Sequence, residues 1–285
     1  MEFPIRTLTK DEWPSLVSEI NDPPKVLYAR GALASPTQKL LAVVGSRAAT
    51  TYGKEVTKKL IAGLRGYPIT IVSGLAIGID GIAHEAALEN NLHTVSVPGS
   101  GIDDSVIYPA RHKRLAHRIL ESGGALLSEF EPTFRATTWS FPARNRIMAG
   151  MSHAVLVVEA RERSGTLITS RLATEYNRDV LTIPGSIFAE GSAGPHMLIR
   201  LGATPITSSH NILEALGFPV DVEAAPKQLE LSTDEQKLYD LLSEPLTRDM
   251  LIRKCEMPTS SASVIISLME LKGSVVEFGG KIRRT

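Results

Sequence analysis

Short apolar segments that end at glycine or serine and give way to helical spacing recur through the first three quarters of this chain of 285 residues. This alternation is the pattern of strands joined by crossover helices, and it predicts a parallel sheet. The predicted strands cover residues 40–44, 69–72, 94–97, 154–158 and 180–183, with 125–127 as a further strand.

The pattern stops near Phe218, where a short polar stretch with prolines predicts a linker. Beyond it, three helical segments and a hairpin-like end resemble a winged helix. Its third helix, opened by Pro258, carries Val264, Ile265, Leu268 and Leu271 on one predicted apolar face. We predict a short N-terminal extension (1–38), a sheet domain (39–217), a linker (218–232) and a winged-helix-like domain (233–285).

Composition excludes several classes of protein. With 43% hydrophobic and 22% charged residues, the chain is neither a disordered tail nor a collagen-like sequence, and its single cysteine cannot form an internal disulfide. No apolar run approaches the ~20 residues that cross a bilayer, so we expect no membrane span and a cytoplasmic location. Because 31 basic residues balance 31 acidic ones, any binding of nucleic acid must depend on local clusters of charge.

The loops after four predicted strands carry serine with glycine. The carboxyl ends of parallel strands meet at one edge of a sheet, where ligands bind. Unpaired amides near helix N-termini favour an anion there, so these loops predict a phosphate-bearing ligand. The alternative is that the glycines only allow tight turns.

Common catalytic motifs are incomplete in this sequence. Gly53-Lys54 is followed by Glu55 instead of the hydroxyl residue of a Walker loop, and no dinucleotide fingerprint is present. His84-Glu85 lacks the second histidine of a zinc-protease helix. We therefore expect no catalytic residue, no metal and no cofactor.

Five motifs in order resemble the DNA-processing protein A (DprA, or Smf) family. They are Gly45-Ser46-Arg47, the segment 73–80, Gly101-Ile102-Asp103 with Tyr108-Pro109, the segment 141–147, and the segment 164–169. The resemblance implies an α/β fold with an extended Rossmann-like, mostly parallel sheet and a small C-terminal winged-helix domain. It also implies a homodimer that binds single-stranded DNA, protects it and helps to load RecA during natural transformation and recombination.

Candidate DNA contacts follow from cations beside small-residue loops and aromatic rings. A guanidinium group can bind phosphate through two hydrogen bonds, and a ring can stack on a base. Phe141 is the expected stacking residue, whereas Phe130 and Trp139 fit either stacking or a buried cluster. The candidates are Gly45, Ser46, Arg47, Phe141, Arg144, Asn145, Arg146, Ser164, Gly165 and Thr166, with a second set of Gly74, Ser100, Arg111, Lys113 and Arg114.

Three further expectations concern alternatives and the C-terminal domain. An enzyme alternative is a nucleoside monophosphate phosphoribohydrolase of the lysine-decarboxylase-like type, with Glu159 or Glu129 as its carboxylate. Another alternative is a non-catalytic nucleotide-sensing module. The third helix of the winged-helix-like domain has no Arg, Lys, Asn or Gln over 259–271, so we expect it not to read duplex DNA.

Overall fold

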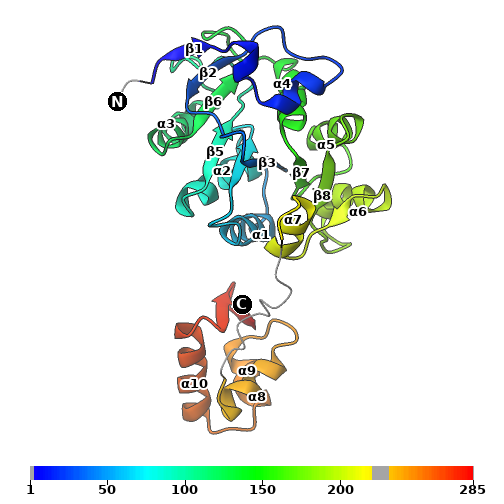
Figure 1. Ribbon diagram of the computed structural model, residues 1–285. Coiled ribbons are helices and arrows are strands. Elements are labelled where there is room, and N and C mark those ends of the chain that lie inside the picture. The colour runs from blue at the N-terminus through cyan, green and yellow to red at the C-terminus, as the bar shows by residue number, and fades with distance from the viewer. Residues whose placement is uncertain (1–2, 220–230, 285) are drawn as a thin grey trace. The chain divides into compact units, whose positions relative to one another are not determined.

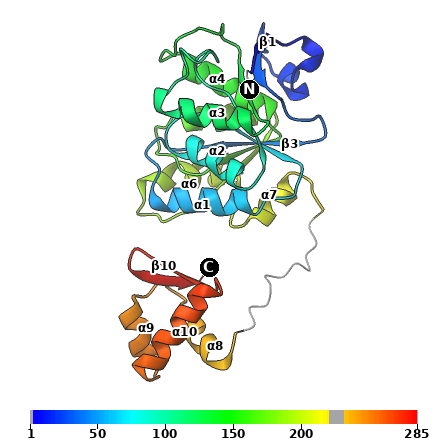
Figure 2. The same cartoon turned by 90° about the vertical axis from the view of Figure 1, so that its left-hand side faces the viewer.

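The computed structural model describes residues 3–219 and 231–284, and its contacts divide the chain into two units, Met1–Val220 and Asp221–Thr285. The larger unit is a nine-stranded sheet between two layers of helices (Figures 1 and 2). Its strands are β1 (Ile5–Thr7), β2 (Tyr28–Gly31), β3 (Lys39–Val44), β4 (Ile69–Ser73), β5 (His93–Ser96), β6 (Ala125–Ser128), β7 (Ala154–Val157), β8 (Asp179–Thr182) and β9 (Thr204–Pro205).

The strand order is β1-β2-β6-β5-β4-β3-β7-β8-β9. Strands β3 to β9 pair in parallel, while β1 and β2 are antiparallel to their neighbours. The six predicted strands and the mostly parallel sheet are thus confirmed, and the N-terminal extension adds two unpredicted strands to the same sheet. From β3 the chain builds outward through β4, β5 and β6, and then returns to place β7 on the other side of β3. The order therefore reverses between β3 and β7, the kind of place where ligands bind in open α/β sheets.

Both faces of the central strands are buried, which explains why they read as continuous apolar runs. Leu41 and Val43 face a cluster that includes α1 and α2, whereas Ala42 and Val44 face a cluster that includes α4 and α5. Figure 2 shows α1, α2 and α3 side by side over one face. The helices are α1 (Thr51–Ala62), α2 (Ile79–Glu89), α3 (Lys113–Glu121), α4 (Ser140–Met151), α5 (Thr166–Glu175), α6 (Ala193–Arg200) and α7 (Ser209–Ala215), with short 3-10 turns η1 (Lys10–Glu12), η2 (Ser15–Glu19), η3 (Ala110–His112) and η4 (Glu190–Ser192).

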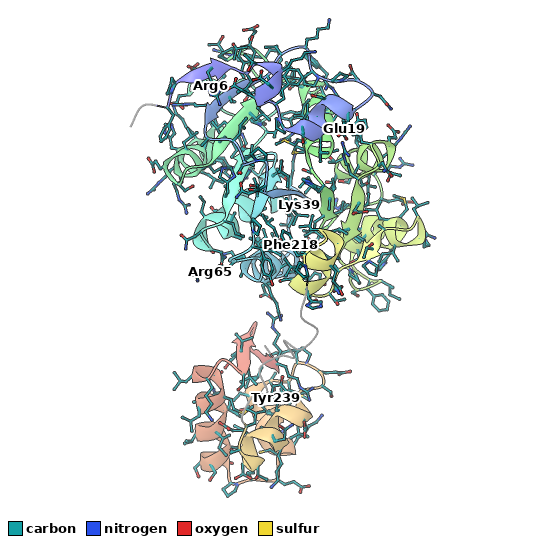
Figure 3. All side chains as sticks on the ribbon, viewed as in Figure 1. Arg6, Glu19, Lys39, Arg65, Phe218 and Tyr239 are labelled. Carbon is teal, nitrogen blue, oxygen red and sulfur yellow. The ribbon has the colours of Figure 1, made fainter. Side chains whose placement is uncertain are left out.

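The smaller unit has three helices and a two-stranded hairpin, as predicted for a winged helix: α8 (Thr233–Leu241), α9 (Arg248–Lys254), α10 (Thr259–Leu271), β10 (Val275–Phe278) and β11 (Lys281–Arg284). Ser232 caps α8 by accepting a hydrogen bond from the Glu235 backbone N–H at 3.3 Å. Tyr239 packs against the small core of this unit (Figure 3). Most of the predicted linker, 218–232, lies outside the described residues.

The predicted apolar face of α10 is only partly correct. Ala262, Ile266 and Met269 form its buried face, whereas the predicted Val264, Leu268 and Leu271 are exposed. The helix carries two apolar stripes, so spacing alone does not choose between them. The stripe that contains the small Ala262 is the one that packs inward.

None of the helices in residues 3–219 and 231–284 is both long and apolar enough to cross a membrane. The described residues also contain no group of three His, Cys, Asp or Glu side chains placed to hold a metal ion.

Candidate nucleic-acid interface

A cleft of about 590 Å³ opens where β3 and β7 end, at the reversal of strand order. Its walls come from the loop after β3, the start of α4 and the loop that leads from β7 into α5. Nine of the ten first-choice residues predicted from the sequence line it, all but Arg146: Gly45, Ser46, Arg47, Phe141, Arg144, Asn145, Ser164, Gly165 and Thr166. The chain therefore brings loops far apart in the sequence to one edge of the sheet.

Arg47 is the exposed cation at the centre of this arrangement. Its guanidinium carbon lies 5.0 Å from the centroid of the Phe141 ring, within the range of a cation–π contact. No ion pair to Arg47 is found among residues 3–219 and 231–284. In the same loop, the Ser46 hydroxyl accepts a hydrogen bond from the Ala48 N–H at 3.1 Å, which shapes the turn.

Phe141 is held in place from two sides. It lies in the first turn of α4, where the following Pro142 is tolerated because first-turn N–H groups have no partner within the helix. A methyl group added at Gly99 would lie 2.5 Å from Phe141 Cδ1, so glycine lets the loop approach the ring. The Tyr108 ring contacts Phe141 at a centroid distance of 5.6 Å.

Arg144 borders the cleft but does not present a free guanidinium group to it. The side chain is buried, and its Nη1 atom donates hydrogen bonds to the Gly74 carbonyl, at 2.5 Å, and to the Val97 carbonyl. The Nη1 donors of Arg144 join the loops after β4 and β5, whereas Nε makes no hydrogen bond within the described residues. The contact of Arg144 with phosphate therefore stays a prediction. Burial lowers the pKa of Arg144 to about 10, so it remains charged at neutral pH.

Asp80 is the buried carboxylate that accompanies Arg144. Its Oδ2 atom accepts hydrogen bonds from the N–H groups of Gly74, at 3.1 Å, and Ala76, at 3.4 Å. Burial raises the pKa of the Asp80 carboxyl, and the positive charge of Arg144 opposes this shift. Asp80 and Arg144 both bond the backbone of Gly74, and together they fix the floor of the cleft.

Arg146 is directed away from the cleft. Its guanidinium group pairs with Glu129, donates to the Asp22 carbonyl at 2.7 Å and approaches the Asp22 carboxylate at 3.5 Å. Arg144 and Arg146 are two positions apart on α4, and such positions do not share a helix face. The prediction that Arg146 contacts DNA is thus corrected, since it ties α4 to the segment before β2.

The loop before α5 supplies cations that the sequence prediction missed. Arg161 and Arg163 line the cleft, and both are exposed. Arg161 pairs with the exposed Glu190 at 3.0 Å. A signal for both was available, since they directly precede the predicted Ser164-Gly165 loop at a strand end.

Two hydrogen bonds among the predicted residues fix the conformation of the loop before α5. The Ser164 hydroxyl accepts from the Thr166 N–H at 3.2 Å, so that amide is already bonded. Asn145 donates to the Gly165 carbonyl at 3.4 Å. These contacts position the loop against α4.

Two residues of the second candidate set are buried in other roles. Gly74 uses its carbonyl for Arg144 and its N–H for Asp80, so neither group is available to DNA. The Ser100 side chain is fully buried, and its hydroxyl donates to the Gly101 carbonyl at 2.9 Å. The prediction of DNA contacts by Gly74 and Ser100 is therefore corrected.

Arg111, Lys113 and Arg114 of the second set lie in and after η3, outside the main cleft. Arg111 lines a neighbouring pocket, described below, whereas Lys113 and Arg114 are exposed at the start of α3. Phe130, Phe134 and Trp139 pack on one another, with centroid distances of 4.7 and 5.6 Å, so they form an aromatic cluster beside the cleft.

Comparisons with known proteins agree with this architecture. Residues 4–217 match the family model for DNA recombination-mediator protein A, and residues 222–281 match the DprA winged helix domain. The chain is 39% identical to Protein Smf of Escherichia coli over 281 residues, which is 95% of this chain and 75% of that protein.

Two solved structures are similar to the larger part of the chain. DNA processing protein A of Streptococcus pneumoniae has a TM-score of 0.69 and 42% identity, covering 78% of this chain and 76% of that one. DNA processing protein A of Helicobacter pylori has a TM-score of 0.67 and 31% identity, covering 75% of this chain and 96% of that one. The chain therefore belongs to the DNA recombination-mediator protein A family of DNA-processing proteins.

Proposed function

We propose that this protein binds single-stranded DNA in the cleft and catalyses no reaction on it. The observation that carries the proposal is the exposed Arg47 guanidinium against the Phe141 ring, beside Arg163 in one open cleft. Single strands are held by cations that follow the phosphates and by aromatic faces that accept bases. The cleft provides both, and the similar Helicobacter pylori protein is described as binding single-stranded DNA.

In this proposal, each part of the cleft has a distinct task. Arg47 and Arg163 bind phosphates, Phe141 stacks on a base, and the Arg144–Asp80 pair holds the loops in position. Stacking and phosphate contacts do not distinguish bases, so we expect little dependence on sequence. Affinity should fall steeply with salt, because bound phosphates release counterions.

The enzyme alternative is less well supported by the carboxylates. Glu159, its main candidate, is buried and accepts hydrogen bonds from the Thr50 N–H, at 3.0 Å, and the Thr50 hydroxyl, so it anchors the start of α1. Glu129 is bonded to Arg146. Neither is among the residues that line the cleft, where Asp80 is the one carboxylate within the described part of the chain. Release of free base from a nucleoside monophosphate, lost in Glu159→Gln, would favour the enzyme.

The family description supports a role in recombination, and we propose that the protein helps to load RecA on transforming DNA as a homodimer. Both parts can be tested separately. Sedimentation gives the mass of the free protein, and RecA filament growth on single strands coated with a single-strand-binding protein tests loading. A monomer, or filament growth unaffected by the protein, would contradict the respective part.

For the winged-helix domain we propose a protein contact rather than the reading of duplex DNA. The exposed face of α10 carries the apolar Val264, Leu268 and Leu271, and the helix has no Arg, Lys, Asn or Gln to read base edges through two hydrogen bonds. Sequence-specific affinity of the full chain for a duplex, abolished by Leu268→Asp, would contradict this proposal.

The experiment that tests the main function is a length series of fluorescent oligothymidines measured by anisotropy. We expect affinity to rise with length and unlabelled single strands to compete far better than duplexes. Tight binding of a mononucleotide with no gain from longer oligomers would instead indicate a nucleotide-sensing module. Absence of binding to any oligothymidine would refute the proposal.

A further inference from the structure

A second pocket, of about 380 Å³, adjoins the cleft on the other side of Arg47. Arg47 and Ala48 line both, so the two cavities share a wall. The second pocket lies between the start of α1, the first turns of α2 and η3. It is a separate extension of the same edge of the sheet.

The charge of this pocket is positive. Arg47, Lys54 and Arg111 line it with Glu85 as its one carboxylate among the described residues, which gives a formal net charge of 3 − 1 = +2 with histidine neutral. Lys54 and Arg111 are exposed and enter no ion pair within residues 3–219 and 231–284. Neither cation neutralises a carboxylate of the described residues, so both are available to an anion.

The wall of the pocket is fixed rather than adaptable. His112 Nδ1 lies 2.7 Å from the Leu75 carbonyl oxygen, and because a carbonyl only accepts, Nδ1 is the donor. A methyl group at Gly81 would lie 2.7 Å from His112 Cε1, so the imidazole is seated directly on α2. The backbone before α2 turns at Gly78, whose φ of +84° favours glycine.

An aromatic surface leads from the cleft toward this pocket. The Tyr108 ring is 49% exposed and contacts Phe141, which faces the cleft. Three residues further along the chain, Arg111 lines the second pocket. A DNA strand that runs from Phe141 toward the second pocket passes the Tyr108 ring and then the Arg111 guanidinium group.

We infer that the second pocket binds the phosphodiester backbone of the same DNA strand beyond the cleft, through Lys54 and Arg111. The inference rests on the proposed function and adds a second contact region to it. Arg47, shared by both cavities, would mark the point where the strand passes from one to the other. A strand long enough to reach both gains affinity that a short strand cannot.

The test compares oligothymidines of about 4 and about 12 nucleotides, within the range of site sizes of single-strand binders. The double variant Lys54→Gln/Arg111→Gln should bind the short oligomer as the wild type does. For the long oligomer, the slope of log affinity against log salt should fall by about 1.4, which is ~0.7 for each of two phosphates. Gly81→Ala, which displaces His112 without a change of charge, should likewise weaken only the long oligomer.

The matched control is Lys59→Gln/Arg65→Gln, which removes two exposed cations from the other end of α1 and the turn after it (Arg65 is labelled in Figure 3). It should leave both oligomers unaffected, and thermal unfolding checks that every variant is folded. Equal weakening of both oligomers by the Lys54/Arg111 variant would indicate general attraction, and no weakening of either would mean an unused pocket; each result overturns the inference. Failure of the wild type to bind either oligomer would instead refute the proposed function.

Discussion

The guanidinium group of Arg47 lies over the ring of Phe141, 5.0 Å from its centroid, although the two residues belong to a strand-end loop and a helix far apart in the sequence. The contact orders a long, exposed side chain before any ligand arrives. Ordering a flexible side chain in advance lowers the entropic cost of binding. The pair therefore joins a phosphate ligand and a stacking platform in one preformed unit.

Replacing Arg47 should reveal its phosphate contact. Arg47→Ala should weaken the binding of oligothymidine and lower the slope of log affinity against log salt by about 0.7, the value for one phosphate on a single strand. Anisotropy titrations at several salt concentrations measure this slope. Arg146→Gln is the matched control, because it removes the same charge from a guanidinium group already bound to Glu129 and Asp22. An unchanged slope in Arg47→Ala would show that Arg47 binds no phosphate.

Replacing Phe141 should have a different signature. Phe141→Leu keeps an apolar side chain but removes the π-face, so affinity should fall by about 1–3 kcal/mol, the usual contribution of one stacked base. The salt slope should stay near that of the wild type if Arg47 remains in place. Because the two side chains touch, the losses in the double variant should not equal the sum of the single losses. Strict additivity in this double-mutant cycle would argue against a joint unit.

How far the sequence predicts this site depends on the kind of element. The parallel strands were predictable because both their faces are buried, which leaves continuous apolar runs such as 40–44. Helix α4 was not, because Phe141 and Pro142 in its first turn mask the helical pattern. Without α4, the opposite directions of Arg144 and Arg146 could not be foreseen.

The sequence alone also does not show which charged side chains are buried and which loops they join. The sequence shows Asp80 six residues after Gly74, but not that Arg144, 70 residues after Gly74, donates to the Gly74 carbonyl. Arg163 was not predicted to contact DNA, because an arginine in a run of charged residues is typical of a solvated surface. Only tertiary packing distinguishes a cation that holds the floor of the cleft, such as Arg144, from one exposed in the cleft, such as Arg163.

The Arg144–Asp80 pair should matter for stability more than for charge in the cleft. Arg144→Met removes the hydrogen bonds to the Gly74 and Val97 carbonyls and the positive charge that favours the Asp80 carboxylate. Hydrogen bonds of charged groups typically contribute about 1.5–3 kcal/mol each. Urea unfolding near neutral pH measures the loss. Adding Asp80→Asn to that variant should recover part of the stability, because no uncompensated charge then remains. A double variant less stable than Arg144→Met alone would contradict this account of the pair.

His84 should make the fold sensitive to acid. Its ring is buried, with Nδ1 2.7 Å from the Thr94 hydroxyl, which itself donates to the Ile71 carbonyl at 2.8 Å, so Nδ1 carries the proton of a neutral ring. Burial lowers the pKa of His84 to about 3, whereas an unfolded histidine titrates near 6.5. The unfolded chain therefore binds a proton that the folded chain excludes, and this stabilising contribution is complete above pH ~6.5 and is lost as the pH falls toward 3.

In this window His84 should lower the free energy of unfolding by up to about 1.4 kcal/mol for each pH unit of acidification. His84→Asn keeps a donor for Thr94 but does not titrate, so urea unfolding between pH ~7 and ~4 should give it a shallower dependence on pH than the wild type. Parallel curves for the two proteins would show that His84 is protonated in the fold or does not control its acid stability.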